Sequence, residues 1–75
     1  MDKLMEILED INPDIDYDRE TRLIDGSLLD SMSVLELVST LEDEFNIEIT
    51  PTELVPANFN SAQAMWAMVQ RLQNA

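Results

Sequence analysis

Apolar residues recur with a helical period at three places along the chain. The first stretch follows the i, i+3, i+4, i+7 spacing of an amphipathic helix, with Leu4, Ile7, Leu8 and Ile11 on one face. This spacing predicts a helix over residues 2–11. Pro13 closes the segment, because proline cannot continue the helical hydrogen bonding.

The second stretch is longer and predicts a helix over residues 31–45. At 100° per residue, its apolar residues fall within one broad sector: Val34, Leu35, Leu37, Val38, Leu41 and Phe45. Asp30 is a good N-cap for this helix, and its negative charge suits the helix dipole. Met32 falls on the polar side, where an exposed apolar residue is either a partner contact or an isolated surface methionine.

Two further helices are expected after residue 49. Thr50 and Glu53 have the spacing of a capping box, which predicts a short third helix that Pro56 ends. The last helix is predicted to start near Ser61. One face of it carries Ala62, Met65, Val69 and Leu72. Trp66 lies at the edge of that face and is interpreted as core or boundary packing.

Residues 12–30 form a long connection without a strong period, which suggests a packed or functional loop. Leu23, Ile24, Leu28 and Leu29 are expected to pin it to the core. The sequence therefore predicts an all-α fold in a single domain over residues 1–75. It would be a small four-helix bundle with three longer helices, one short third helix and a long loop between the first two helices.

The charge balance narrows the choice of partners. Sixteen acidic residues face four basic ones, and the formal net charge is −12. Such a surface repels nucleic acid and anionic lipid and attracts positively charged protein surfaces. The acidic run over residues 42–44 is expected to be solvated. No apolar run approaches the roughly 20 residues of a membrane span, and the acidic N-terminus is not a signal peptide. We therefore expect a cytoplasmic monomer without membrane insertion.

The residue types present disfavour catalysis and metal binding by the chain itself. The chain has no His and no Cys, so it lacks the groups that usually serve as bases, nucleophiles or soft metal ligands near pH 7. Asp14, Asp16 and Asp18 match the opening of an EF-hand loop. Arg19 and Asp25, however, occupy the positions where that loop requires Gly and Glu. We expect neither a metal site nor enzyme activity.

Ser31 is the strongest candidate for a functional residue. A lone hydroxyl is a weak nucleophile without an adjacent base, so modification explains this serine better than catalysis does. At the start of a helix, backbone N–H groups and the dipole favour a phosphate on its oxygen. Taken alone, however, Ser31 beside Asp30 is also an ordinary capping pair.

The sequence around Ser31 resembles the acyl carrier protein family. The similarity rests on Leu29-Asp30-Ser31-Met32, followed by Glu36-Leu37-Val38, Leu41-Glu42-Asp43-Glu44-Phe45 and Ile47-Glu48-Ile49. Length, helix order and acidity extend it over nearly the entire chain. The resemblance implies a four-helix bundle that carries 4′-phosphopantetheine, derived from coenzyme A, on Ser31. The thiol of this arm would hold acyl or aminoacyl groups as thioesters.

The resemblance also implies the partners. A phosphopantetheinyl transferase would modify Ser31, with Asp30 and Met32 beside the cofactor. Loading and acyl-transfer enzymes would then dock on the second helix through basic patches. The expected contacts on that helix are Met32, Leu35, Glu36 and Asp43.

Three functions remain in competition. The first is a freestanding acyl carrier protein, with fatty-acid or related cargo slightly ahead. The second is a D-alanyl or other aminoacyl carrier with the same site. The length of the segment over residues 50–61, with Leu54 and Phe59 at matching bulky positions, favours this subgroup, and Ser33 and Ser39 depart from the usual fatty-acid carriers. The third is an unmodified acidic adaptor, a bundle that binds a basic partner and never uses Ser31.

Overall fold

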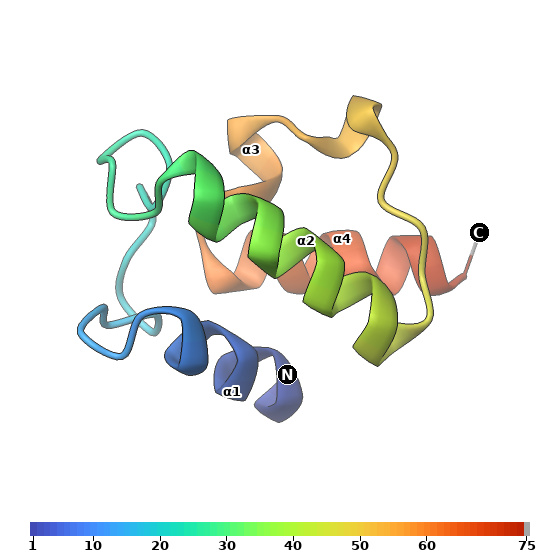
Figure 1. Ribbon diagram of the computed structural model, residues 1–75, viewed down its shortest axis with the longest axis horizontal. Helices are drawn as coiled ribbons and strands as arrows, with labels where there is room; N and C mark the ends of the chain where they lie inside the picture. Colours follow the sequence, from blue (N-terminus) through green and yellow to red (C-terminus); the bar gives the residue numbers. More distant parts are fainter. Residues whose placement is uncertain (75) are drawn as a thin grey trace.

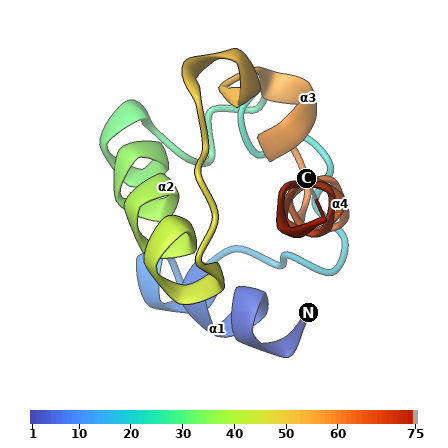
Figure 2. The same ribbon diagram turned by 90° about the vertical axis from the view of Figure 1, so that its right-hand side faces the viewer.

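The computed structural model describes residues 1–74, and its secondary structure in that range is entirely helical. The elements are α1 (Asp2–Ile11), α2 (Ser31–Phe45), the 3₁₀ turn η1 (Pro51–Glu53), α3 (Pro56–Phe59) and α4 (Ala62–Gln73). Helix α2 runs across the molecule with α1 below it and α4 behind it (Figure 1). The short α3 lies above α4, near the end where α4 begins (Figure 1), and the turned view separates the three long helices (Figure 2). The all-α prediction is confirmed.

Local capping explains why the two later long helices begin where the sequence predicts. Asp30 accepts a hydrogen bond at its Oδ1 from the backbone N–H of Ser33, at 2.8 Å. Ser61 does the same through its Oγ for the N–H of Ala64, at 3.1 Å. Each cap satisfies a helix-start donor that would otherwise lack a partner. The predicted bounds of α1 and α2 are confirmed without change.

A short third helix is present as predicted, but its predicted position is wrong. No helix grows from Thr50 beyond the 3₁₀ turn, and Pro56 begins α3 instead of ending a helix. The capping box does not form, because the Thr50 hydroxyl pairs with that of Thr52 at 2.8 Å. Glu53 instead binds Arg71 with both carboxylate oxygens, at 3.0 and 2.7 Å. At the first position of α3, the missing N–H of Pro56 removes no helical hydrogen bond.

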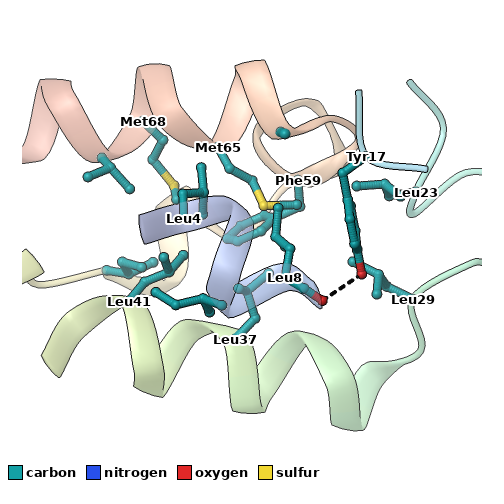
Figure 3. Close-up of a cluster of buried hydrophobic side chains, with 14 residues drawn as sticks. Leu4, Leu8, Tyr17, Leu23, Leu29, Leu37, Leu41, Phe59, Met65 and Met68 are labelled. Carbon is teal, nitrogen blue, oxygen red and sulfur yellow. Dashed lines mark hydrogen bonds between the residues drawn. The ribbon is translucent and has the colours of Figure 1, made fainter. Parts of the chain in front are cut away.

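The core gathers apolar side chains from α1, α2, α3, α4 and the long loop (Figure 3). The fully buried members of large volume are Leu4, Leu8, Leu23, Leu37, Leu41, Met65, Met68 and Val69. Tyr17 of the loop is also buried, and its hydroxyl donates to the carbonyl oxygen of Leu8 at 2.9 Å. Burial raises the pKa of the Tyr17 hydroxyl. Trp66 packs edge-on against Phe45 with ring centroids 5.8 Å apart, which confirms it as boundary packing.

The loop between α1 and α2 is pinned by fewer leucines than the sequence predicts. Leu23 and Leu29 are buried and Ile24 is half-buried, but Leu28 is 40% exposed. Leu28 and Leu29 are consecutive residues of the loop, and their side chains point in different directions, so only one of them faces the core. Leu29 takes that position, and Leu28 is left at the surface beside the start of α2.

Candidate functional site

Ser31 is the first residue of α2 and is exposed to solvent. Its neighbour Asp30 is also exposed, and the Ser33 N–H holds the pKa of the Asp30 carboxyl below its ordinary value of 3.8. The capped helix start fixes the backbone on both sides of the Ser31 hydroxyl. The helix dipole there favours a phosphate on that oxygen. An exposed, rigidly held hydroxyl at such a place fits the attachment of a phosphate-linked arm.

An apolar cleft opens directly beside Ser31. Its volume is about 370 Å³, and residues of the loop, α2 and the α3 region line it. The lining residues are Ile24, Leu29, Asp30, Ser31, Val34, Leu35, Leu54, Val55, Pro56 and Phe59. Sequence reasoning did not assign Val55 or Pro56 to the site. One signal in the sequence points to them. Val55 directly precedes Pro56, and a residue before a proline is disfavoured in helical geometry, so the apolar pair Leu54-Val55 is expected outside a helix.

Large apolar side chains are exposed around the same serine. Met32 is 74% exposed and Leu35 58% exposed, and Leu54 and Val55 are each more than two-fifths exposed. Leu35 belongs to the broad apolar sector predicted for α2, but its side chain does not enter the core. It lies 200° around the helix from the fully buried Leu37, which places it at the sector's outer edge. The exposure of Met32 agrees with its predicted place on the polar side.

Acidic side chains lie on the side of α2 that points away from the apolar cleft. Glu36 lines a groove of about 520 Å³ between α1 and α2, and Asp43 is exposed further along the helix. The groove is lined by Lys3, Glu6, Ile7, Glu9, Asp10, Ile11, Glu36, Thr40 and Glu44. Lys3 forms a salt bridge with Glu44, and this pairing raises the pKa of the lysine. The negative charge of the other acids in the groove is left in excess.

The acidic run over residues 42–44 is exposed at two of its three positions, and none of the three is buried. Glu42 is half-buried and accepts a hydrogen bond from the backbone N–H of Ile49 at 2.9 Å. Glu44 pairs with Lys3, and Asp43 is exposed. Within residues 1–74, acidic side chains form no cluster suited to a metal ion. No helix in the same range combines the length and apolar character needed to cross a membrane.

Stability is expected to fall in acid partly through Glu53, which ties the cleft-lining segment to α4. Arg71 holds the pKa of the Glu53 carboxyl below its ordinary 4.5. A lowered folded-state pKa gives stability that is present above 4.5 and lost as the pH falls through the folded value. Glu53→Gln should therefore be less stable than the wild type at neutral pH, and the difference should shrink in acid.

Urea unfolding at several pH values would measure this difference. Asp43→Asn removes an exposed acid elsewhere and should leave the pH dependence of the wild type in place. An equal difference between Glu53→Gln and the wild type at neutral and acid pH would contradict the assigned role of the Arg71 pair.

Comparison with known proteins indicates the family of the chain. The model of the phosphopantetheine attachment site family matches residues 2–69. The chain is 39% identical over 56 residues to the probable acyl carrier protein PigG of Serratia sp. (strain ATCC 39006). That alignment covers 75% of this chain and 64% of the length of the relative. No solved structure matches the chain.

The helical fold and these matches define a carrier protein with a phosphopantetheine attachment domain. The chain belongs to the acyl carrier protein family. The cofactor of this family is a covalently attached 4′-phosphopantetheine. The resemblance read from the sequence is confirmed.

Proposed function

We propose that this protein carries acyl groups as thioesters on a 4′-phosphopantetheine arm attached to Ser31 and passes them between enzymes. The observation that carries the proposal is the exposed Ser31 hydroxyl at the capped start of α2, beside an apolar cleft. In this proposal the chain is a carrier and not a catalyst. It acts as a single domain and a monomer in the cytoplasm.

Ser31 receives the arm from coenzyme A through a phosphopantetheinyl transferase. The Ser31 hydroxyl loses its proton and forms a phosphodiester bond, and the adenosine bisphosphate part of coenzyme A leaves. The arm, once bound, supplies the terminal thiol that a chain without cysteine lacks. Asp30 keeps the backbone of the modified serine in place through its bond to the Ser33 N–H.

Partner enzymes dock on the exposed face of α2. Exposed Met32 and Leu35 offer apolar contact close to the arm. Glu36 and Asp43 attract basic patches, which speeds encounter while leaving each complex short-lived. Asp43 lies twelve positions after Ser31, or roughly 18 Å along the helix at 1.5 Å per residue. A partner that contacts both Ser31 and Asp43 therefore spans most of α2.

The cleft favours an acyl over an aminoacyl cargo. Its walls beyond Asp30 and Ser31 are apolar, so a hydrocarbon chain leaves water on entering it. The ammonium group of a D-alanyl cargo would lose hydration against the same walls, and Asp30 is the one charged partner in the lining. The similarity to a protein described as a probable acyl carrier points the same way. A D-alanyl carrier is the second candidate, supported by the bulky Leu54 and Phe59 in the cleft wall.

Intact mass spectrometry after incubation with coenzyme A and a broad-specificity transferase tests the carrier proposal. A phosphopantetheine-sized gain supports it, and no gain from a folded sample with an active transferase favours the unmodified adaptor. Butyryl and D-alanyl forms, made from the matching coenzyme A thioesters, then test the cargo. Butyryl is expected to shift the amide resonances of Val34, Leu54 and Val55 more than D-alanyl does. Equal shifts, or larger shifts with the D-alanyl form, would make the aminoacyl carrier the preferred function.

A further inference from the structure

Asn60 joins the long loop to the junction between α3 and α4. It is half-buried, and its Oδ1 accepts hydrogen bonds from the backbone N–H groups of Ile24 and Asp25, both at 3.0 Å. Its Nδ2 donates to Oδ2 of Asp25 at 3.0 Å. Its backbone carbonyl accepts from the N–H of Leu23 at 2.9 Å. One asparagine therefore fixes three successive loop residues that lie far from it in the sequence.

These hydrogen bonds continue toward the start of α2. The carbonyl oxygen of Leu23 accepts from the N–H groups of Leu28 and Leu29, at 2.9 and 3.0 Å. Asp30 follows Leu29 directly and caps the helix at Ser31. A continuous hydrogen-bonded path thus runs from Asn60 through Leu23 to the residue before the cap.

The turn enclosed by this path is tight and conformationally demanding. The N–H of Gly26 donates to the carbonyl oxygen of Arg22 at 2.6 Å, and a Cβ on Gly26 would lie 2.6 Å from that oxygen. Ser27 has a φ of 59°, in the left-handed region that residues other than glycine seldom adopt. A turn of this kind needs contacts from outside to keep one conformation, and Asn60 supplies them.

Asn60 also connects the two sides of the apolar cleft. Ile24 and Leu29 line it from the loop, while Pro56 and Phe59 line it from the segment that Asn60 ends. Figures 1 and 2 both show the loop passing beside the α3–α4 junction. A change at Asn60 therefore alters the two walls that flank Ser31, although the asparagine does not line the cleft.

We infer that Asn60 is a positioning residue, which holds the loop leading into α2 and so sets how Ser31 is presented to the transferase. The inference rests on the proposed modification of Ser31. It assigns Asn60 no contact with the reacting atoms. Its side chain acts by holding the backbone of Ile24 and Asp25, which directly follow Leu23. The bonds from Leu23 to Leu28 and Leu29 then carry the effect to the start of α2.

The test compares transferase kcat/KM among variants, at a temperature where circular dichroism shows each of them folded. Asn60→Ala removes all the side-chain bonds and is expected to lower kcat/KM on the order of tenfold. Asn60→Asp should also lower the transferase kcat/KM, because the new carboxylate faces and repels the carboxylate of Asp25. The double variant Asn60→Asp with Asp25→Asn exchanges donor and acceptor and should return to within about twofold of the wild type.

Asn58→Ala is the matched control. The Asn58 side chain lies in α3, and within residues 1–74 its hydrogen bonds go to Glu53 of η1, at 2.8 and 3.2 Å. This variant should keep the wild-type kcat/KM. A wild-type kcat/KM in Asn60→Ala, or no recovery in the exchanged pair, would overturn the inference.

Amide hydrogen exchange separates failure of this inference from failure of the proposed function. Asn60→Ala should speed exchange at Leu28 and Leu29 and shift the amide resonance of Ser31, whether or not any transferase acts. If wild-type Ser31 is never modified but these changes appear, the carrier proposal fails and the positioning of Ser31 stands. If the three amides keep their wild-type behaviour, the positioning role is refuted independently of modification.

Discussion

Replacing Ser31 with alanine is expected to abolish phosphopantetheine loading completely. The arm needs an oxygen to form its phosphodiester bond, and an alanine methyl group has none. The substitution should leave the fold in place, because Asp30 and not Ser31 supplies the side-chain cap of α2. Ser31 is exposed, so shortening it opens no cavity. Intact mass should show the unmodified chain only, and the helical circular dichroism and urea midpoint should stay close to the wild type.

Ser39→Ala provides the matched control. Ser39 is also exposed on α2, two turns further along the helix, and lies outside the cleft beside Ser31. This variant should load as the wild type does. Loading of Ser31→Ala would show that another hydroxyl carries the arm. Loss of loading in both variants would point to damage to the docking surface of α2 instead of loss of the attachment atom.

The elements that the sequence predicts well are those fixed by local interactions. The start of α2 depends on Asp30, which lies within three residues of the N–H group that it caps. The start of α4 depends on Ser61 in the same way. Because both partners of such a bond are neighbours in the chain, the sequence pattern and the geometry coincide. The attachment candidate Ser31 is located by the same local logic together with the family resemblance.

The segment after α2 could not be predicted locally, because long-range partners decide it. Glu53 is available for a capping box with Thr50, but Arg71 of α4 binds both of its carboxylate oxygens. Nothing in the residues around Thr50 indicates that an arginine so far along the chain lies within reach. With the box lost, Leu54 and Val55 leave helical geometry and become a wall of the cleft.

The hydrogen bonds of Asn60 have the same long-range character. Its partners in the loop lie 35 and 36 positions earlier. An isolated Asn next to Ser61 indicates only a helix boundary in the sequence. The position of Ser31 is therefore predictable from the chain, whereas the scaffold that orients it emerges only from the packing of the loop against the α3–α4 junction.

Replacing Leu37 with alanine is expected to cost about 2–5 kcal/mol of unfolding free energy. Leu37 is fully buried and points from α2 into the cluster that contains Leu8 of α1 (Figure 3). A chain of 75 residues has a total stability of roughly 4–11 kcal/mol at 0.05–0.15 kcal/mol per residue. The loss is therefore a large share of the whole, and the variant should be partly unfolded at physiological temperature. Urea unfolding followed by circular dichroism would measure the loss.

Leu35→Ala is the control that separates stability from docking on the same helix. Leu35 is 58% exposed, so its truncation should change the unfolding free energy by no more than about 0.5 kcal/mol. It removes apolar surface beside Ser31, however, and should weaken transferase docking in a fully folded protein. A large stability loss in Leu35→Ala would show that the leucine belongs to the core after all. A small loss in Leu37→Ala would contradict the packing of α2 against α1, on which the presentation of Ser31 depends.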